Sequence, residues 1–483
     1  MIVTAPTPQS PFKANQAALD AEQNGGSGPS PPAYGSYGSY AHPTRIRSGQ
    51  SPARRFFEAF VVAIVIYALC GMLTGSMFWV SHDGRHHRGV SPVVHACSTL
   101  SELTQQWYVQ DWPGDSSEQG WPLPSDGEAY TCVTGGGWTA SLALREYPYT
   151  SHTEFELPLD SDVLYLLARG RLAYGAVEVV DWEDGEDNVR IEVIASYYTP
   201  AALNRASVCE LSRKDGEHGV GIFTPNDWRH VNREDQIHFD LVVHIPASSA
   251  RVRAFETNLP LFRHRFLTSE RLTFDSLSVH GSNMAIDATS LQAEHATLRT
   301  SNGPITGVFN TSTSLELHTS NAPIKAAIGL TNTPSGTSTT LILRTSNGPI
   351  DSSLSLLSSE STKGSYDVNT ETSNNVLNVH YDAAPLEHTL VHHARTSNGP
   401  ATVSLPRTYE GAFALRSSNI SPSVVQTDRN PEDPSGQGRR RWLSIYKVKN
   451  VLTGAVYWGS EKKGEKGTVD VQTSNSPARL VLL

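Results

Sequence analysis

An acidic run is the first feature of this 483-residue sequence whose side chains could do chemistry. Its members are Asp181, Glu183, Asp184, Glu186 and Asp187. Carboxylate oxygens are the ligands that Ca²⁺ prefers, but their spacing here is not that of an EF-hand loop. We therefore favour a solvated turn over a Ca²⁺ site at this position.

A histidine group near the C-terminal end is a second candidate for metal binding. It consists of His388, His392 and His393. On a β-strand, positions four residues apart share a face but are about 13 Å from each other, too far to hold one ion. Surface histidines are the favoured interpretation, and the sequence predicts neither a metal site nor a cofactor.

Aromatic and basic side chains are mixed in residues 427–467. The aromatic members are Trp442, Tyr446, Tyr457 and Trp458, with arginines and lysines on both sides. Flat rings beside cations suit an anionic glycan or a lipid headgroup surface. The alternative, which we favour, is a hairpin that caps the preceding repeats and leaves its lysines solvated.

Carboxylates that could act as a catalytic pair are not evident in the C-terminal half. Asp287, Glu316, Asp351 and Asp367 share no register, whereas glycosidases need two carboxylates at one site. No nucleophile elbow, P-loop, zinc-protease or dinucleotide-binding motif occurs in a suitable context. We predict that the protein is not an enzyme; the alternative is a polysaccharide lyase or hydrolase.

A repeated hexamer, T-S-N-G-P-I, is the strongest local pattern in the sequence. Close copies occupy 300–305, 319–324, 345–350 and 396–401, and weaker copies begin near 281, 372, 417 and 473. Asn and Gly tolerate positive φ and Pro restricts φ, so each copy is expected to turn the chain. The predicted turn residues are Asn302, Gly303, Asn321, Asn347, Gly348, Asn398 and Gly399.

The spacing of the hexamers indicates how these turns are arranged. Most copies recur roughly every 20 to 27 residues, with apolar alternation on either side. That length fits one coil of a β-solenoid with two or three short strands. Stacked coils would align the asparagines, each able to bond the backbone of the next coil. A series of ordinary hairpins is the competing interpretation, because Asn-Gly is also a hairpin turn.

A β-rich layer is expected before the repeats, in residues 141–235. Segments 175–181 and 189–194 alternate with period two and are predicted to form a hairpin across the acidic run. Further strands are predicted at 206–211, 220–224 and 237–245. The predicted fold is therefore all-β: a β-sandwich-like layer followed by a β-solenoid over 236–483, with an insertion at 427–467.

The repeats resemble the putative-adhesin family, a domain of unknown function with T-S-N-G-x-I-like repeats on a β-solenoid. Residues 237–247, IHFDLVVHIPA, look like that family's first strand and its following turn. The resemblance covers about 236–483. The chain departs from the family pattern at the proline of the hexamer and at the insertion. The β-layer, together with an apolar segment at 56–80 and the residues 1–55 before it, resembles membrane-anchored, fungal-like versions. The family implies no catalytic residue.

A nearly continuous apolar segment lies within residues 56–80. An α-helix over 59–80 would be about 33 Å long, enough to cross a hydrocarbon core of about 30 Å. The segment starts too late and is too long for a secretory signal peptide, so it is predicted to be a signal-anchor. Residues 1–55 are rich in Gly, Pro and Ser, and we predict that they form a disordered tail.

The flanks of this segment predict its orientation. More arginines precede it than follow it, which places the N-terminus in the cytoplasm and the C-terminal domain in a lumen or outside the cell. Asn310 and Asn419 begin glycosylation sequons, which are used only on that side. Gly71 and Gly75 form a GxxxG motif that could pair two membrane helices as a homodimer.

Residues 81–140 are predicted to form a stalk and an irregular, tryptophan-rich subdomain. Cys97 and Cys132 both lie there and are the preferred disulfide pair. The chain carries a net charge of −10, while residues 1–55 are net basic, so the rest is acidic. Nucleic acid is therefore excluded as a partner. A non-catalytic, adhesin-like binding or scaffolding domain is predicted instead, with a cell-wall glycan or another surface protein as its partner.

Overall fold

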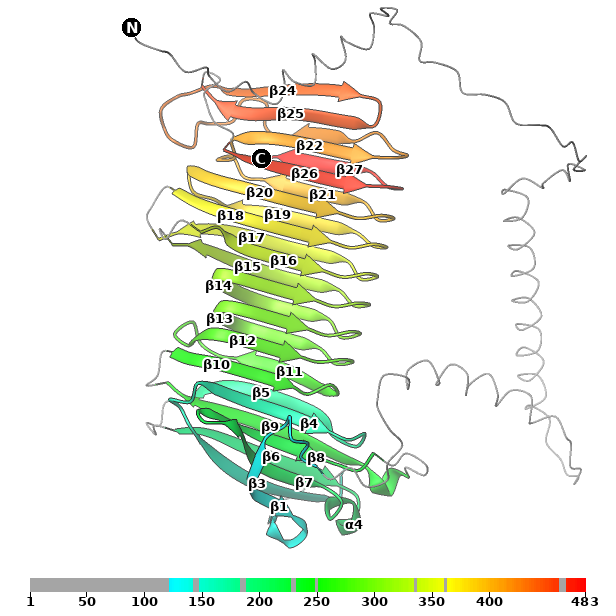
Figure 1. Ribbon diagram of the computed structural model, residues 1–483. Helices are drawn as coiled ribbons and strands as arrows, with labels where there is room; N and C mark the ends of the chain where they lie inside the picture. The colour runs from blue at the N-terminus through cyan, green and yellow to red at the C-terminus, as the bar shows by residue number, and fades with distance from the viewer. Residues whose placement is uncertain are drawn as a thin grey trace, which may run out of the picture. The chain divides into compact units, whose positions relative to one another are not determined.

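The computed structural model describes residues 121–141, 147–182, 188–226, 232–247, 251–333, 337–359, 363–459 and 466–483. The predicted tail (1–55), the membrane segment (56–80) with Gly71 and Gly75, and most of the acidic run lie outside these residues. Within them, no helix is long and apolar enough to cross a membrane. The described part of the chain is almost entirely β, with 27 strands, which confirms the predicted all-β class (Figure 1).

The strands form two ladders, which we call the first and the second ladder. In order of pairing, the first ladder is β1 (Glu128–Thr134), β7 (Ser207–Lys214), β8 (Glu217–Phe223), β4 (Val163–Arg169), β10 (Arg251–Asn258), β12 (Thr273–His280), β13 (Ile286–Arg299), β14 (Ile305–His318), β16 (Thr339–Arg344), β18 (Lys363–Glu371), β20 (Glu387–Arg395), β26 (Gly467–Thr473), β22 (Gly411–Ser417), β25 (Val451–Trp458) and β24 (Arg441–Val448).

The second ladder contains β2 (Thr139–Ser141), β3 (Tyr149–Pro158), β6 (Asn188–Tyr197), β9 (Ile237–Pro246), β5 (Tyr174–Trp182), β11 (Phe262–Leu267), β13, β14, β15 (Ile324–Asn332), β17 (Ile350–Ser358), β19 (Leu377–Ala383), β21 (Ala401–Leu405), β27 (Ala478–Leu482) and β23 (Ser423–Gln426). The long strands β13 and β14 belong to both ladders. A short helix, α4 (Pro200–Leu203), follows β6.

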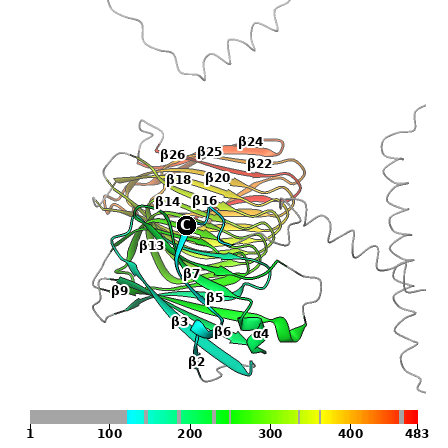
Figure 2. The same cartoon turned by 60° about the horizontal axis from the view of Figure 1, so that its bottom comes forward.

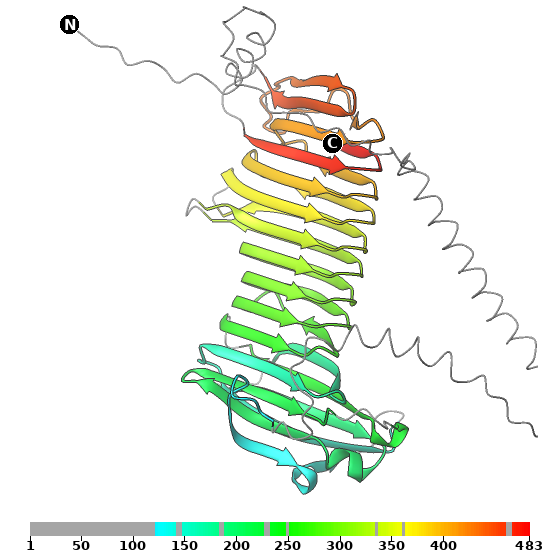
Figure 3. The ribbon, with the colours of Figure 1, turned by 45° about the vertical axis from the view of Figure 1, so that its right-hand side comes forward.

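Each hexamer joins a strand of the first ladder to a strand of the second. The chain passes from β16 through residues 345–349 into β17, and the next coil stacks on this one in parallel. Successive turns therefore lie above one another along one edge of the molecule (Figure 3). Figure 2 shows the same stack behind the antiparallel strands of the N-terminal part.

The core lies between the two ladders and follows from the period-two pattern. Alternate side chains of a strand point to opposite faces, and along the coils the inward positions are apolar. In the coils from β13 to β17, the residue that starts each second-ladder strand is fully buried and in register with its neighbours: Ile286, Ile305, Ile324 and Ile350. This continuous apolar column is the main source of stacking free energy, because apolar burial is roughly proportional to stabilisation.

The predicted hairpin in the N-terminal layer is wrong, although its two strands are present. β5 and β6 do not pair with each other: β9 lies between them, parallel to β5 and antiparallel to β6. Period-two alternation indicates a strand and its buried face, but it does not specify the partner strand. β1 lies within residues 81–140, for which an irregular subdomain was predicted, and β2 begins there.

The predicted Cys97–Cys132 disulfide is wrong. Cys132 is instead bonded to Cys209. The two residues lie opposite each other on the antiparallel strands β1 and β7, with their Cα atoms 4.1 Å apart. Cys97 was preferred for its proximity in sequence, but the sheet brings Cys132 to a residue 77 positions away.

Peptide mapping under non-reducing conditions checks this pairing. A tryptic digest of the full-length protein is expected to contain one linked peptide pair holding Cys132 and Cys209, which separates on reduction. The cross-strand register brings these two sulfurs together in the folded chain. A linked pair containing Cys97 and Cys132 would contradict the fold of the N-terminal layer.

The C-terminal strands do not form the end of the stack. β26 lies between β20 and β22, and β27 lies between β21 and β23 (Figure 1). The chain therefore forms the coil of β22 and β23 first. Its last two strands then insert between that coil and the coil of β20 and β21. The hairpin of β24 and β25 pairs with β22 at the far end. This is the capping hairpin that was the favoured interpretation of residues 427–467.

Candidate binding surface

The asparagines of the hexamer form one row along the turn edge, which we call the asparagine row. Each side-chain amide after the first donates a hydrogen bond to the side-chain oxygen of the asparagine before it in the row. In order, the members are Asn283, Asn302, Asn321, Asn347, Asn374, Asn398, Asn475 and Asn419, with N–O distances of 2.6–2.8 Å. The bonds were expected to reach the backbone of the next coil but join side chain to side chain. All eight residues are exposed.

The threonine of the hexamer explains how each turn is attached to the one before it. Thr345 is buried; its hydroxyl donates to the carbonyl of Ala322 at 3.2 Å and accepts from the backbone N–H of Gly348 at 3.1 Å. The backbone N–H groups of Ser346 and Asn347 both donate to the carbonyl of Ser320 in the preceding coil. The same contacts recur in other coils, so the turn residues are structural and point the asparagines outward.

The glycines of the hexamer lie against the backbone of the preceding coil. A methyl group on Gly303, Gly348 or Gly399 would overlap the carbonyl oxygen of Met284, Ala322 or Asn375, respectively. From Asn283 to Asn475 the position after the asparagine alternates between glycine and a residue with a side chain. The predicted turn residues Gly303, Gly348 and Gly399 are therefore required for close stacking.

Removal of one interior asparagine tests the row. Asn347 donates one hydrogen bond and accepts another, whereas Asn419 at the end makes one within the row. At about 0.5–1 kcal/mol for each bond, Asn347→Ala is expected to cost about 1–2 kcal/mol of unfolding free energy and Asn419→Ala about half of that. Urea denaturation of the full-length chain measures both. Equal effects of the two substitutions would show that the bonds along the row contribute nothing.

The four aromatic residues considered as surface contacts do not all lie on the same face of the capping hairpin. Trp442 and Tyr446 are exposed, by 53% and 71%, and Trp442 lies opposite the half-buried Tyr457 across the two strands. Trp458 is buried, and its indole N–H donates to the carbonyl of Arg407 at 3.0 Å. The prediction of a surface contact is therefore wrong for Trp458, which is part of the core, while the other three share the outer face of the hairpin.

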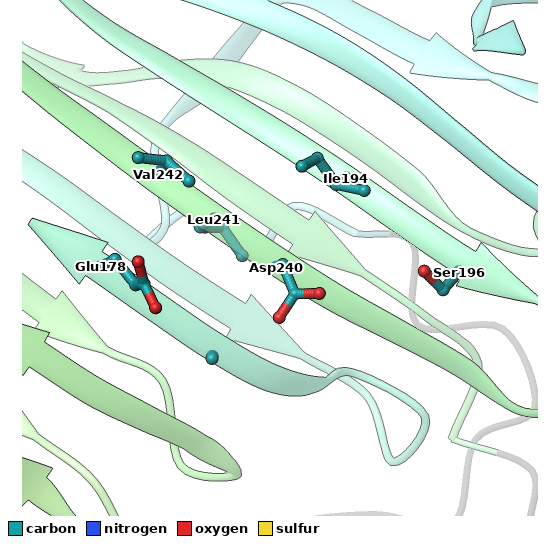
Figure 4. Close-up of a pocket in the computed structure, with 7 residues that line it drawn as sticks. Glu178, Ile194, Ser196, Asp240, Leu241 and Val242 are labelled. Carbon is teal, nitrogen blue, oxygen red and sulfur yellow. The ribbon is translucent and has the colours of Figure 1, made fainter. Parts of the chain in front are cut away.

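A hollow of about 300 Å³ lies on the outer face of the second ladder, where β5, β6 and β9 adjoin (Figure 4). Its polar lining is Glu178, Ser196 and Asp240. Glu178 makes an ion pair with Arg265, and Asp240 lies 3.1 Å from the imidazole of His238. Sequence reasoning missed this hollow, because part of its lining comes from β9, which lies between β5 and β6 in the sheet but follows both of them in sequence.

Tyrosines surround His238 beside this hollow. The hydroxyl of Tyr147 lies 3.0 Å from that of Tyr174, and the rings of Tyr147 and Tyr198 are 4.8 Å apart. Burial and the hydrogen bond shared with Tyr147 raise the pKa of Tyr174. The Tyr174 hydroxyl is therefore a neutral hydrogen-bond donor and acceptor near neutral pH. Aromatic faces with such polar ends are suited to sugar rings.

Two of the three C-terminal histidines are buried, which corrects their assignment to the surface. His392 is fully buried, with its ring nitrogens 3.1 Å from the hydroxyls of Thr370 and Tyr381. His388 lies beside the carbonyl of Pro385 at 2.6 Å, and only His393 is exposed. Burial lowers the pKa of His392 to about 3 and also lowers the pKa of His388. These histidines are neutral members of the core.

The two predicted glycosylation acceptors differ in accessibility. Asn419 is exposed at the end of the asparagine row, whereas Asn310 is half-buried on β14 with its side-chain oxygen against Gly329. The acidic run, for which a solvated turn was favoured over a Ca²⁺ site, lies mostly outside the described residues. Of its carboxylates, that of Asp181 accepts from the backbone N–H of Ser269. No cluster of three metal-ligating side chains occurs in the described ranges.

Residues 294–427 match the model of a family described as a domain of unknown function, DUF7330. The match lies within the region 236–483 in which the repeats resemble an adhesin-like family of unknown function. No curated protein matches the sequence.

Three solved structures align with the chain. A putative cell adhesion protein from Clostridium sporogenes is 9% identical with a TM-score of 0.17, covering 69% of this chain and 100% of that one. A putative adhesin from Parabacteroides merdae is 11% identical with a TM-score of 0.23, covering 53% and 95%. A putative adhesin from Parabacteroides distasonis is 10% identical with a TM-score of 0.23, covering 69% and 97%. Similarity of this size carries no argument about ligands.

Proposed function

We propose that this chain is a single-pass membrane protein whose β-domain is an adhesin-like module that binds extended glycans without altering them. The observation that carries the proposal is the asparagine row: eight exposed amides at regular steps along one edge. Stacked strands repeat about every 4.8 Å. A linear polymer that lies along the edge would therefore contact an asparagine side chain in each successive coil. Many weak contacts on one chain add through effective concentration.

The rest of the surface fits this function. In this proposal the coils form a β-solenoid, a fold whose long regular surface offers many equivalent contacts. Exposed serine hydroxyls at 301, 346, 373 and 397 flank the asparagines and provide further donors and acceptors for sugar hydroxyls. Trp442 and Tyr446 on the capping hairpin add aromatic faces on which sugar rings can stack.

The proposed topology places residues 1–55 in the cytoplasm, the helix at 56–80 in the membrane and the β-domain in a lumen or outside the cell. The arginines that precede the apolar segment support this orientation. The Cys132–Cys209 disulfide supports it independently, because disulfides persist in oxidising compartments. On that side Asn419 is the more accessible of the two sequons, and Gly71 and Gly75 are proposed to pair two anchors.

A carbohydrate-active enzyme is the second candidate, and the hollow between β5, β6 and β9 is the observation in its favour. Glu178 and Asp240 line the same hollow, and two carboxylates can serve as acid and base in glycoside cleavage. The ion pair of Glu178 with Arg265 engages one of them. This supports a binding role for the hollow over a catalytic one.

Incubation of the full-length protein in detergent micelles with chitin, β-glucan and mannan tests the two functions together. Co-sedimentation measures binding, and size-exclusion chromatography measures polymer length. Binding with unchanged polymer length is the expected result. Polymer shortening that is lost in Asp240→Asn, but retained in the exposed control Asp351→Asn, would establish the enzyme instead. Neither binding nor shortening would end the glycan proposal.

A further inference from the structure

A second hollow, of about 240 Å³, lies on the outer face of the first ladder where β16, β18, β20 and β26 adjoin. Its polar lining is Arg344, Asn369, Glu371, His393, Arg395, Asp470 and Gln472. Arg344, Glu371, Arg395 and Gln472 each directly precede the threonine of a hexamer, so the hollow adjoins the edge that carries the asparagine row.

Arginine recurs at the position before the first residue of the hexamer, which is threonine in three copies and Ser417 in the fourth, and most of these arginines are paired. Arg299 pairs with Glu316 at 3.0 Å, Arg344 with Glu371 at 3.7 Å, and Arg416 with Asp470 at 3.0 Å. Arg395 is the exception. It is exposed and has no ion pair or side-chain hydrogen bond within the described part of the chain.

The charges around the hollow leave one cation without a partner. Glu371 and Asp470 are both engaged by other arginines, so the guanidinium of Arg395 is the surplus charge. Its five N–H donors form a fork that matches a carboxylate in a bidentate arrangement. A single surplus charge also matches a carboxylate better than a phosphate monoester, which carries nearly two charges at neutral pH.

Neutral hydrogen-bonding groups surround this cation. Asn369, His393 and Gln472 line the hollow and make no side-chain hydrogen bond among the described residues. An amide, an imidazole and a second amide beside a guanidinium offer donors and acceptors for several hydroxyls around one carboxylate. That combination of groups is the chemistry of a sugar acid.

We propose that this hollow binds a uronic acid unit of a glycan, with the carboxylate on Arg395 and the sugar hydroxyls on Asn369, His393 and Gln472. The inference rests on the proposed glycan-binding function and specifies its substrate class: acidic polysaccharides bind in preference to neutral ones. The hollow is the anchoring point, and the asparagine row beside it extends the contact along the polymer.

Isothermal titration of the full-length chain with a galacturonic acid trimer and with the matching galactose trimer tests the proposal. The acidic trimer is expected to bind at least about tenfold more tightly, because one charge-assisted contact contributes about 1.4 kcal/mol or more. Arg395→Gln is expected to remove that preference while leaving the galactose affinity unchanged. Arg299→Gln is the matched control: it occupies the same repeat position outside the hollow and should keep the preference.

The outcomes separate this inference from the proposed function. Binding of both trimers with equal affinity would overturn the uronate site and leave the glycan function standing. Loss of the preference in Arg299→Gln as well as in Arg395→Gln would also overturn it, since the effect would then be general electrostatics. Galactose 6-phosphate serves as a third probe, and tighter binding of it than of galacturonate would assign the site to phosphate. Absence of binding to any saccharide would overturn both proposals.

Discussion

Replacement of Gly348 by alanine is expected to destabilise the protein by about 3 kcal/mol or more, at the upper end of what overpacking costs. The added methyl group would overlap the backbone carbonyl of Ala322 in the preceding coil. A backbone atom cannot rotate away as the end of a flexible side chain can, so the two coils must separate. Separation would also stretch the bonds of Thr345 and Asn347 to that coil.

Gly281 provides the matched control for this substitution, because it lies on the same edge of the stack. A methyl group there would meet no atom nearer than 3.8 Å, so Gly281→Ala is expected to change stability by less than about 1 kcal/mol. Guanidinium denaturation of the full-length chain compares the two variants. Comparable stability of Gly348→Ala and the unmodified protein would show that the coils are not packed this closely.

Acid is expected to destabilise the β-domain well above the pH at which carboxylates protonate. Burial lowers the pKa of His264 to about 4 and that of His392 to about 3, whereas an unfolded histidine has a pKa of about 6.5. The unfolded state therefore binds more protons, and stability falls as the pH drops below about 6.5. Each histidine contributes a slope approaching about 1.4 kcal/mol per pH unit down to its folded pKa.

Urea midpoints between pH 7 and pH 4.5 measure this slope. Over that range the two histidines together are expected to remove about 5 kcal/mol. His392→Gln should lower the slope by its own share, approaching about 1.4 kcal/mol per pH unit, while His264 and the buried His388 still contribute. His393→Gln is the control, because His393 is exposed on the same strand and should leave the slope unchanged. A flat profile in the unmodified protein would mean that His264 and His392 are not buried in solution.

The position of each turn could be predicted from the sequence because its cause is local. Pro304 restricts φ, and each close copy of the hexamer repeats that restriction. The positive φ expected of the asparagines and glycines is not observed: Gly303 is needed for its close approach to the preceding coil. Recurrence of the hexamer then indicated stacking, since equal units at similar spacing can share one core. The acceptors of the asparagine bonds could not be predicted, because each side chain could equally have reached a backbone group.

Pairings across long distances could not be predicted. β5 and β6 were identified as strands, but β9 enters between them from more than 40 residues downstream. The Cys132–Cys209 disulfide depends on the same layer, because the register of β1 against β7 decides which sulfurs meet. The hollow of Glu178 and Asp240 likewise exists only once β5 and β9 are adjacent.

The burial of His388 and His392 could have been predicted from the alternation of the residues around them. His388, Leu390, His392 and Ala394 alternate along β20, and all four face the core. Histidine was assigned to the surface because of its polarity, whereas period two with Leu390 and Ala394 places it inside. Arg395 had a similar signal, since arginine recurs before the threonine of the hexamer, but which copy lacks a partner depends on the neighbouring strands.

The length dependence of glycan affinity tests the central claim most directly. The full-length chain would be titrated with a series of galacturonic acid oligomers from one to twelve units. If a polymer contacts successive coils, affinity should keep rising with length until the oligomer spans the asparagine row, because each coil adds contacts at a high effective concentration. A constant affinity beyond two or three units would contradict the account, since it would mean that a single pocket does all the binding.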